Sequence, residues 1–388
     1  MQQLPAVPSR SERLGRVASG VPAVAWWVAG VWAALNIAVA ANAPHADFFD
    51  AQVQLGAARD LLQGSDPYTR YVQNPLWTLL LLTPFALLDE SLLYAGHFAG
   101  MLAMWFAAGV ILLRAGGVPW GPVKTATGAL VTCSYLPVMW STHGQITAYH
   151  GLGVALCLAL WRDRPVLAGA ALVLTIAKPH LGLVPTGALL LWAATTGELR
   201  LLAGFGGALL GLVLASVGIR PQWIGQWVDA VVNPPPEVVV ARAKFAPTVV
   251  HLAGRWLPGE VAAVLGVLAA AVTGGGLLWW LLGERGRLSP NAIVAVAVPA
   301  TFLMTPYAQG YDLSLLAVAG VLLVGGWFRV QGERRRWLGI GLAGVYLFPY
   351  AVQLLGWPQA ALLPSAVVCL ALAAVNRDSL DGARGPAA

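Results

Sequence analysis

Polar residues that could do chemistry are few in this sequence, and most fall in short breaks between long apolar runs. The first break opens with two acids, Asp47 and Asp50, three residues apart. Acids at this spacing share one face of a helix. Such a carboxylate could take a proton from a hydroxyl group, and two together could hold a cation. The structural alternative is that Asp47 only caps the start of a helix.

Basic side chains stand in two later breaks. Lys178 and His180 flank Pro179, which interrupts the helix and directs both side chains into one region. Arg242 and Lys244 follow the sequence N-P-P-P-E in a longer break. Paired cations suit a phosphate diester. A lysine near the end of a membrane span can equally be an anchor that extends its amine to water.

Two more polar residues complete the set. Gln145 follows Gly144 in one break, and Asp312 follows Tyr311 in another. Each could contact a sugar, or could cap or begin a helix. The sequence has no serine–histidine–aspartate arrangement, phosphate-binding glycine loop or zinc-like cysteine–histidine cluster. We therefore expect no metal or other cofactor, with a divalent cation at Asp47 and Asp50 as the alternative.

The composition excludes a soluble globular protein. Of 388 residues 58% are hydrophobic and 10% charged, and the mean hydropathy is +0.70. We predict an all-α integral membrane protein with one polytopic domain at 21–376, between cytoplasmic tails at 1–20 and 377–388. The net charge of +6 does not indicate nucleic acid binding, because the basic residues are scattered and form no face.

Apolar runs of about 20 residues predict the membrane spans. The first, at 21–41, is expected to remain as an uncleaved anchor. Further spans are predicted at 91–113, 124–141, 146–161, 164–178, 181–197, 199–218, 261–283, 290–305, 311–328, 337–355 and 359–376. With the N-terminus inside, most of the 23 Lys and Arg residues fall in inner loops. This requires Pro75–Leu88 to be a re-entrant or surface-lying helix; a short true span is the alternative.

This orientation places the unusual polar residues on the outer face. The first outer loop, 42–90, would hold an amphipathic helix from Phe48 to Leu62 and then the re-entrant helix. Shorter outer segments are 141–145, 177–180 and 305–312, and a long loop covers 219–260. We therefore predict an active site at the outer membrane surface.

Several short motifs resemble those of the polytopic GT-C glycosyltransferases. The resemblance is strongest to glycosyltransferase family 87, which contains bacterial polyprenyl-phosphate-mannose-dependent α-mannosyltransferases. The motifs are D-F-F-D at 47–50, A-A-R-D-L-L-Q-G-S-D-P-Y at 57–68, N-P-L-W-T-L-L-L-L-T-P-F-A-L-L at 74–88, H-G-Q-I at 143–146, I-A-K-P-H at 176–180 and Y-D-L-S-L-L at 311–316.

The resemblance implies a bundle of about 11 to 13 transmembrane helices, with a juxtamembrane helix in the first outer loop. It implies an enzyme that moves a hexose, in this case mannose, from a polyprenyl-phosphate sugar to a lipid or glycan acceptor with inversion. Asp47 would be the general base. The donor phosphate would contact Lys178, His180, Arg242 and Lys244, and the substrates would contact Asp50, Arg59, Tyr68, Gln145 and Asp312. Expected partners are the donor, the acceptor and membrane lipids.

The resemblance also implies a multi-pass protein of a bacterial plasma membrane, with its site on the extracytoplasmic face. Two other functions stay open. A lipid-linked-sugar flippase or secondary transporter would bury carboxylates mid-span, and none is predicted there. A surface-polysaccharide ligase or polymerase would share the outer-face chemistry, and would be marked by a large, arginine-rich outer loop.

Overall fold

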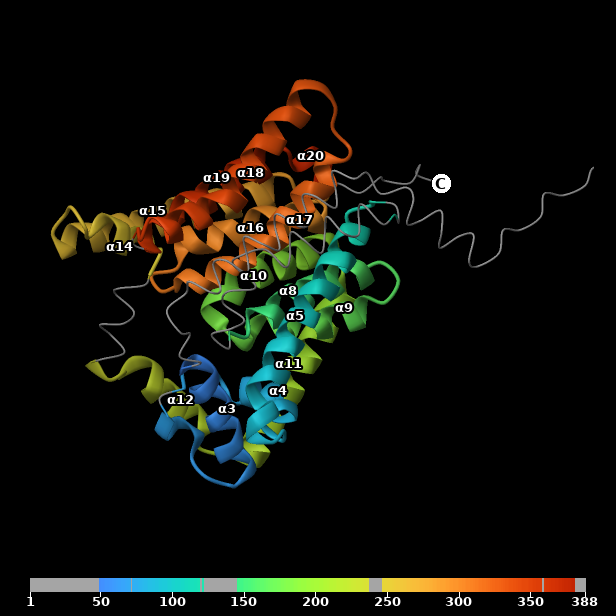
Figure 1. Ribbon diagram of the computed structural model, residues 1–388. Coiled ribbons are helices and arrows are strands. Elements are labelled where there is room, and N and C mark those ends of the chain that lie inside the picture. Colours follow the sequence, from blue (N-terminus) through green and yellow to red (C-terminus); the bar gives the residue numbers. More distant parts are fainter. Residues whose placement is uncertain are drawn as a thin grey trace, which may run out of the picture.

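The computed structural model describes residues 49–70, 72–118, 121, 145–236, 246–357 and 359–380, and this part of the chain is helical without a strand (Figure 1). The α-helices are α3 (Phe49–Leu62), α4 (Leu76–Ala86), α5 (Glu90–Ala115), α8 (Thr147–Leu160), α9 (Pro165–Leu172), α10 (Pro179–Thr196), α11 (Leu199–Ile219), α12 (Trp223–Val232), α14 (Val249–Ala253), α15 (Gly259–Gly283), α16 (Pro290–Met304), α17 (Leu316–Trp327), α18 (Gly332–Leu354), α19 (Leu363–Val375) and α20 (Arg377–Leu380). Short 3-10 helices are η1 (Pro67–Arg70), η2 (Val173–Ala177), η3 (Gly310–Leu315) and η4 (Gln359–Leu362).

The all-α membrane fold class is confirmed. Four helical segments in the described ranges are long and apolar enough to cross a membrane, judged by length and composition: Leu92–Ala115, Leu199–Ile219, Gly259–Gly283 and Gly310–Trp327. Five shorter apolar helical segments accompany them. The predicted spans 21–41 and 124–141 lie outside the described residues, so the total number of spans stays a prediction.

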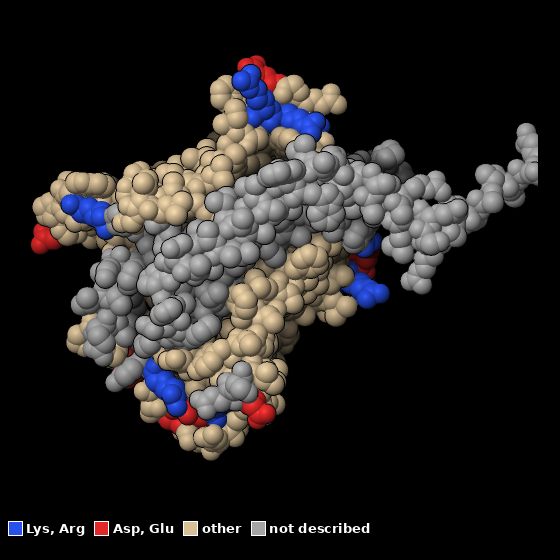
Figure 2. Space-filling model, viewed as in Figure 1, with Lys and Arg blue, Asp and Glu red and all other residues tan. Residues whose placement is uncertain are grey.

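The centre of the bundle is formed by α16 and α17. In the apolar segment Gly310–Trp327, which covers η3 and α17, 89% of the residues are buried. The corresponding shares are 6% for α15 and 11% for α11. Helices α15 and α11 therefore form the periphery and expose their apolar side chains to lipid. Figure 2 shows the consequence on one face, where Lys, Arg, Asp and Glu lie toward the extremities of the described surface.

The segment after the first outer loop is a short helix. With 11 residues, α4 is about 16 Å long, roughly half the thickness of the hydrocarbon core. Arg59 in α3 donates hydrogen bonds to the carbonyl oxygens of Ala86 (3.1 Å) and Leu88 (2.7 Å), where α4 ends. These bonds join α3 to α4, which lie with α12 at one end of the molecule (Figure 1). Whether α4 is re-entrant or surface-lying stays a prediction.

The other end is held by polar bonds between helix termini. Arg329, after α17, donates to the carbonyl oxygens of Gly116 and Ser379. Asn291, at the start of α16, donates to the carbonyl oxygen of Ala115, at the end of α5, over 3.1 Å. Several of the loops that the sequence assigns to the inner face therefore meet at one end of the bundle.

Close contact between α9 and α11 depends on glycine. A Cβ atom on Gly204 would lie 2.1 Å from the carbonyl oxygen of Val166, and one on Gly169 would lie 2.0 Å from that of Leu201. Small residues let membrane helices approach until their backbones touch. This contact fixes α9, which continues through η2 to Lys178.

We expect Gly204→Ala to destabilise the fold, because the new methyl group would collide with the α9 backbone. Overpacking of this kind typically costs about 1 to 3 kcal/mol. Gly207 lies on the same helix, and no described atom is within 4 Å of the place where its Cβ would be, so Gly207→Ala should be neutral or stabilising by up to about 1 kcal/mol. Thermal unfolding of the two purified variants in detergent measures the difference, and equal midpoints would contradict the contact.

Candidate functional site

The candidate site begins at the turn between η2 and α10. Lys178 is extended, with φ −122° and ψ 93°, and Pro179 is the first residue of α10. Proline at this position sacrifices no helical hydrogen bond and disfavours a helical residue before it. A Cβ on Gly182 would lie 1.8 Å from the carbonyl oxygen of Thr175, so only glycine allows α10 to turn back this tightly. The sequence thus fixes where the Lys178 side chain starts.

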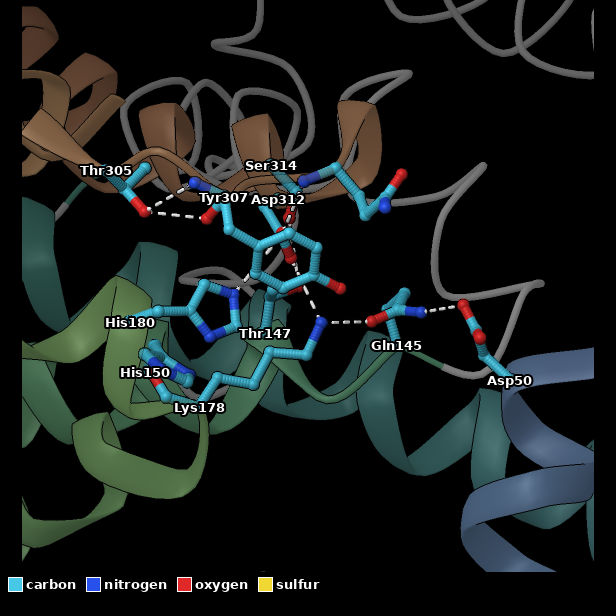
Figure 3. A network of polar contacts seen from close by, with 11 residues as sticks. Asp50, Gln145, Thr147, His150, Lys178, His180, Thr305, Tyr307, Asp312 and Ser314 are labelled. Atoms are coloured by element: carbon cyan, nitrogen blue, oxygen red, sulfur yellow. Dashed lines mark hydrogen bonds and ion pairs between the residues drawn. The ribbon is translucent and has the colours of Figure 1, made fainter. Parts of the chain in front are cut away.

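The Lys178 side chain is buried, with 5% of the residue exposed. Its ammonium nitrogen lies 3.0 Å from Oδ1 of Asp312 and donates to Oε1 of Gln145. It also lies 4.7 Å from the centroid of the Tyr311 ring. A buried charge is stable only when it is paired, so Asp312 is the group that allows an ammonium ion here (Figure 3).

Asp312 is itself buried, with 1% exposed, and both of its oxygens are engaged. Oδ2 accepts the backbone N–H of Gln309 over 2.8 Å, which closes a capping box at the start of η3. Nε2 of His180 lies 3.8 Å from the same oxygen, and the His180 ring packs against Tyr307 with centroids 5.0 Å apart. Asp312 therefore orients Lys178 and His180 and has little surface left for a sugar.

Gln145 connects this pair to the first outer loop. Its Oε1 accepts from Lys178, and its Nε2 donates to Oδ2 of Asp50 in α3. Lysine only donates and an ionised aspartate only accepts, so one orientation of the amide satisfies both neighbours. A continuous polar path thus runs from Asp50 through Gln145 and Lys178 to Asp312 (Figure 3).

Arg59 and Tyr68, which the sequence also predicts as site residues, have hydrogen-bond partners outside this polar path. Arg59 binds the carbonyl oxygens at the end of α4, as described above. Tyr68 is buried, its hydroxyl donates to the carbonyl oxygen of Asn74 over 3.4 Å, and burial raises the pKa of that hydroxyl above its usual range. The remaining three, Asp47, Arg242 and Lys244, fall outside the described residues.

Sequence reasoning missed several residues that surround Lys178. Tyr307 and Tyr311 supply the rings beside His180 and Lys178. His150 is buried, and its Nε2 lies 3.2 Å from the carbonyl oxygen of Lys178. The two tyrosines lie in the same outer segment as Asp312, and this proximity was the one available signal.

The described part of the chain contains no cluster of side chains that would hold a resident metal ion. No group of three or more His, Cys, Asp or Glu side chains is placed there to hold an ion. Asp47, on which the divalent-cation alternative depends, lies outside that part.

Comparison with known proteins gives one match. The family model described as "Glycosyltransferase family 87" matches residues 71–306, more than half of the chain. This range includes Gln145, Lys178 and His180, with Asp50 before it and Asp312 just after it. No curated protein and no solved structure matches.

We expect Asp312→Asn to be strongly destabilising, because it leaves the Lys178 ammonium buried without a counter-charge. Removing one partner of a buried ion pair typically costs about 3 to 5 kcal/mol. The matched control is Asp60→Asn, which breaks an ion pair with the half-exposed Arg70 and should cost about 1 kcal/mol or less. Thermal unfolding compares them, and a loss in Asp312→Asn no larger than in Asp60→Asn would contradict the assigned pairing.

Proposed function

The chain belongs to glycosyltransferase family 87 and is a membrane glycosyltransferase, and from this premise we propose that it transfers a hexose, mannose being the sugar proposed here, from a polyprenyl-phosphate donor. The acceptor is a lipid or a glycan at the membrane surface. A lipid-phosphate donor fits a sequence that has no nucleotide-phosphate loop.

The buried lysine carries this proposal. Lys178 has three N–H donors, and its described hydrogen bonds, to Gln145 and Asp312, use two of them. The third has no hydrogen-bond acceptor among the described residues, although the Tyr311 ring lies nearby, and we propose that it meets an oxygen of the donor phosphate. That phosphate gains negative charge as the bond to the sugar breaks, so a fixed ammonium stabilises the transition state more than the ground state.

The transfer is a single displacement. The acceptor oxygen attacks the anomeric carbon, the bond from that carbon to the phosphate oxygen breaks, and the configuration inverts. The acceptor loses its proton to Asp47, the proposed general base. Asp50 lies three residues further along and is tied to Lys178 through Gln145, which supports placing the start of the first loop beside the phosphate site.

The local charge supports further cations at the phosphate. Lys178 carries one positive charge, whereas Asp50 and Asp312 each carry a negative one when ionised. An anionic lipid phosphate would be repelled unless other positive groups approached it. Protonated His180, together with Arg242 and Lys244 from the long outer loop, would supply them.

The two ends of the bundle support an extracytoplasmic site. α16 begins at the end where Asn291 binds the carbonyl oxygen of Ala115, and it ends near Tyr307, which packs on His180. The positive-inside rule assigns the arginine-rich end to the cytoplasm. Lys178 then faces the outside of a plasma membrane, which we propose to be bacterial.

The residues predicted to contact the substrates have different roles, according to where they lie. Asp50 and Gln145 lie on the polar path and are proposed to meet the sugar or the acceptor. Asp312, with both oxygens engaged, positions Lys178. Arg59 and Tyr68 hold the α3–α4 loop in place, and any contact they make with substrate would come from the rim of the site.

The proposal is tested by a transfer assay in reconstituted membranes, with radiolabelled polyprenyl-phosphate-mannose and a lipid extract as the acceptor source. Asp47→Asn should lower turnover by about 10² to 10⁴, the usual effect of removing a general base. The control is Asp89→Asn, an exposed acid of the same loop, which should retain wild-type turnover.

Two results would contradict the proposal. Equal turnover of the wild type and a folded Asp47→Asn variant would remove Asp47 as the base and direct attention to Asp50. Transfer from a nucleotide sugar, with none from the lipid-linked sugar, would overturn the donor class.

A further inference from the structure

We propose that the protein binds an anionic glycerophospholipid in a groove between α15, α16 and α19, at the arginine-rich end of the bundle. The groove has a volume of about 300 Å³, and its lining is apolar except for Thr273, Trp280 and Arg377. The polar end is marked by Trp280 and Arg377. The donor site lies where α16 ends and α17 begins, whereas the polar end of the groove lies on the side where α16 begins and α17 ends. The groove would therefore be a separate lipid site.

The groove opens on the bilayer. Its longest wall is α15, the helix with the fewest buried residues among the four long apolar segments. Gly276 lies in this wall, and no described atom is within 4 Å of the place where its Cβ would be. The missing side chain leaves space along the helix for an acyl chain.

Positive charge gathers at the polar end. Arg377 pairs with Glu284 over 3.0 Å, which places the turn after α15 beside α20. Arg334 donates to Oδ1 of Asn376, the residue before Arg377, over 2.9 Å. The turn after α15 also carries Arg285 and Arg287. Asp378 also lies 3.8 Å from Arg377. The four arginines still outnumber the acids of this region, which are Glu284, Glu333 and Asp378, and the excess charge is complementary to an anionic headgroup.

Trp280 supplies an unused hydrogen-bond donor. Its indole nitrogen is buried and has no acceptor among the described residues. An indole N–H can only donate, and a buried donor without an acceptor is unfavourable. Trp280 lies four residues before Glu284 on α15, so it is about 6 Å deeper along the helix axis than the ion pair.

These positions match the order of groups in a glycerophospholipid. The phosphate meets Arg377 at the mouth, an ester carbonyl accepts from Trp280 one turn deeper, and an acyl chain follows the surface beside Gly276. Tryptophan commonly occupies this depth in membrane proteins. A zwitterionic lipid fits the apolar part equally, so the arginine excess is what selects an anionic headgroup.

The test is native mass spectrometry of the detergent-purified protein after equilibration with equal amounts of phosphatidylglycerol and phosphatidylcholine. The wild type should retain phosphatidylglycerol in preference to phosphatidylcholine. Arg377→Gln and Trp280→Phe should each lower that retention several-fold. Trp279→Phe is the matched control, because Trp279 is the next residue on the same helix and is 79% exposed; it should bind as the wild type does.

Glu284→Gln separates a lipid site from a purely structural ion pair. It removes the nearer of the two acids that pair with Arg377, so retention of phosphatidylglycerol should be equal or higher, whereas Arg377→Gln lowers it. Equal loss in both charge variants would overturn the proposal, as would equal retention of the two lipids by the wild type. The proposal would also be overturned if Trp279→Phe lost as much phosphatidylglycerol as Trp280→Phe. The same holds if the wild-type protein retained neither lipid.

Discussion

The structure depends on one buried charge. The Lys178 ammonium lies among apolar helices and is stable there only because Asp312 and Gln145 are bonded to it. Each of these partners comes from a different part of the chain, and Gln145 extends the connection to Asp50. The segment before α8, the η2–α10 turn and η3 must therefore be in place together before the lysine is paired, and α3 joins them through Asp50 and Gln145. A single electrostatic requirement thus assembles the site.

The same requirement links fold and function. A lysine that served only to anchor a span would extend its amine to water, whereas Lys178 turns it inward to a carboxylate. Replacement of such pairs by apolar residues is often neutral or stabilising, so stability alone does not explain a buried pair. Under the proposed function its use is to hold an ammonium in a fixed position, where it can act on the charge that develops on a leaving phosphate.

Much of the fold could be predicted from the sequence, because the bilayer sets the length and polarity of its helices. The run at 199–218 corresponds to α11, Leu199–Ile219, and that at 261–283 to α15, Gly259–Gly283. The sequence also places Lys178, Gln145 and Asp312 in the short breaks between apolar runs. It does not show that they pair, because Lys178 and Asp312 are 134 residues apart and no local pattern indicates a contact across that separation. Tyr307 and Tyr311 were missed because aromatic residues are common near membrane surfaces.

The most direct test of the central claim is the affinity for polyprenyl phosphate itself, measured on the wild type and on the double variant Lys178→Gln/Asp312→Asn. This variant removes both charges, keeps the net charge of the protein and leaves amides that can hydrogen-bond. The matched control is Arg70→Gln/Asp60→Asn, which does the same at an exposed pair. We predict a loss of about tenfold or more for the first variant, equivalent to about 1.4 kcal/mol, and none for the second. Wild-type affinity in a folded Lys178→Gln/Asp312→Asn protein would contradict a phosphate site at Lys178.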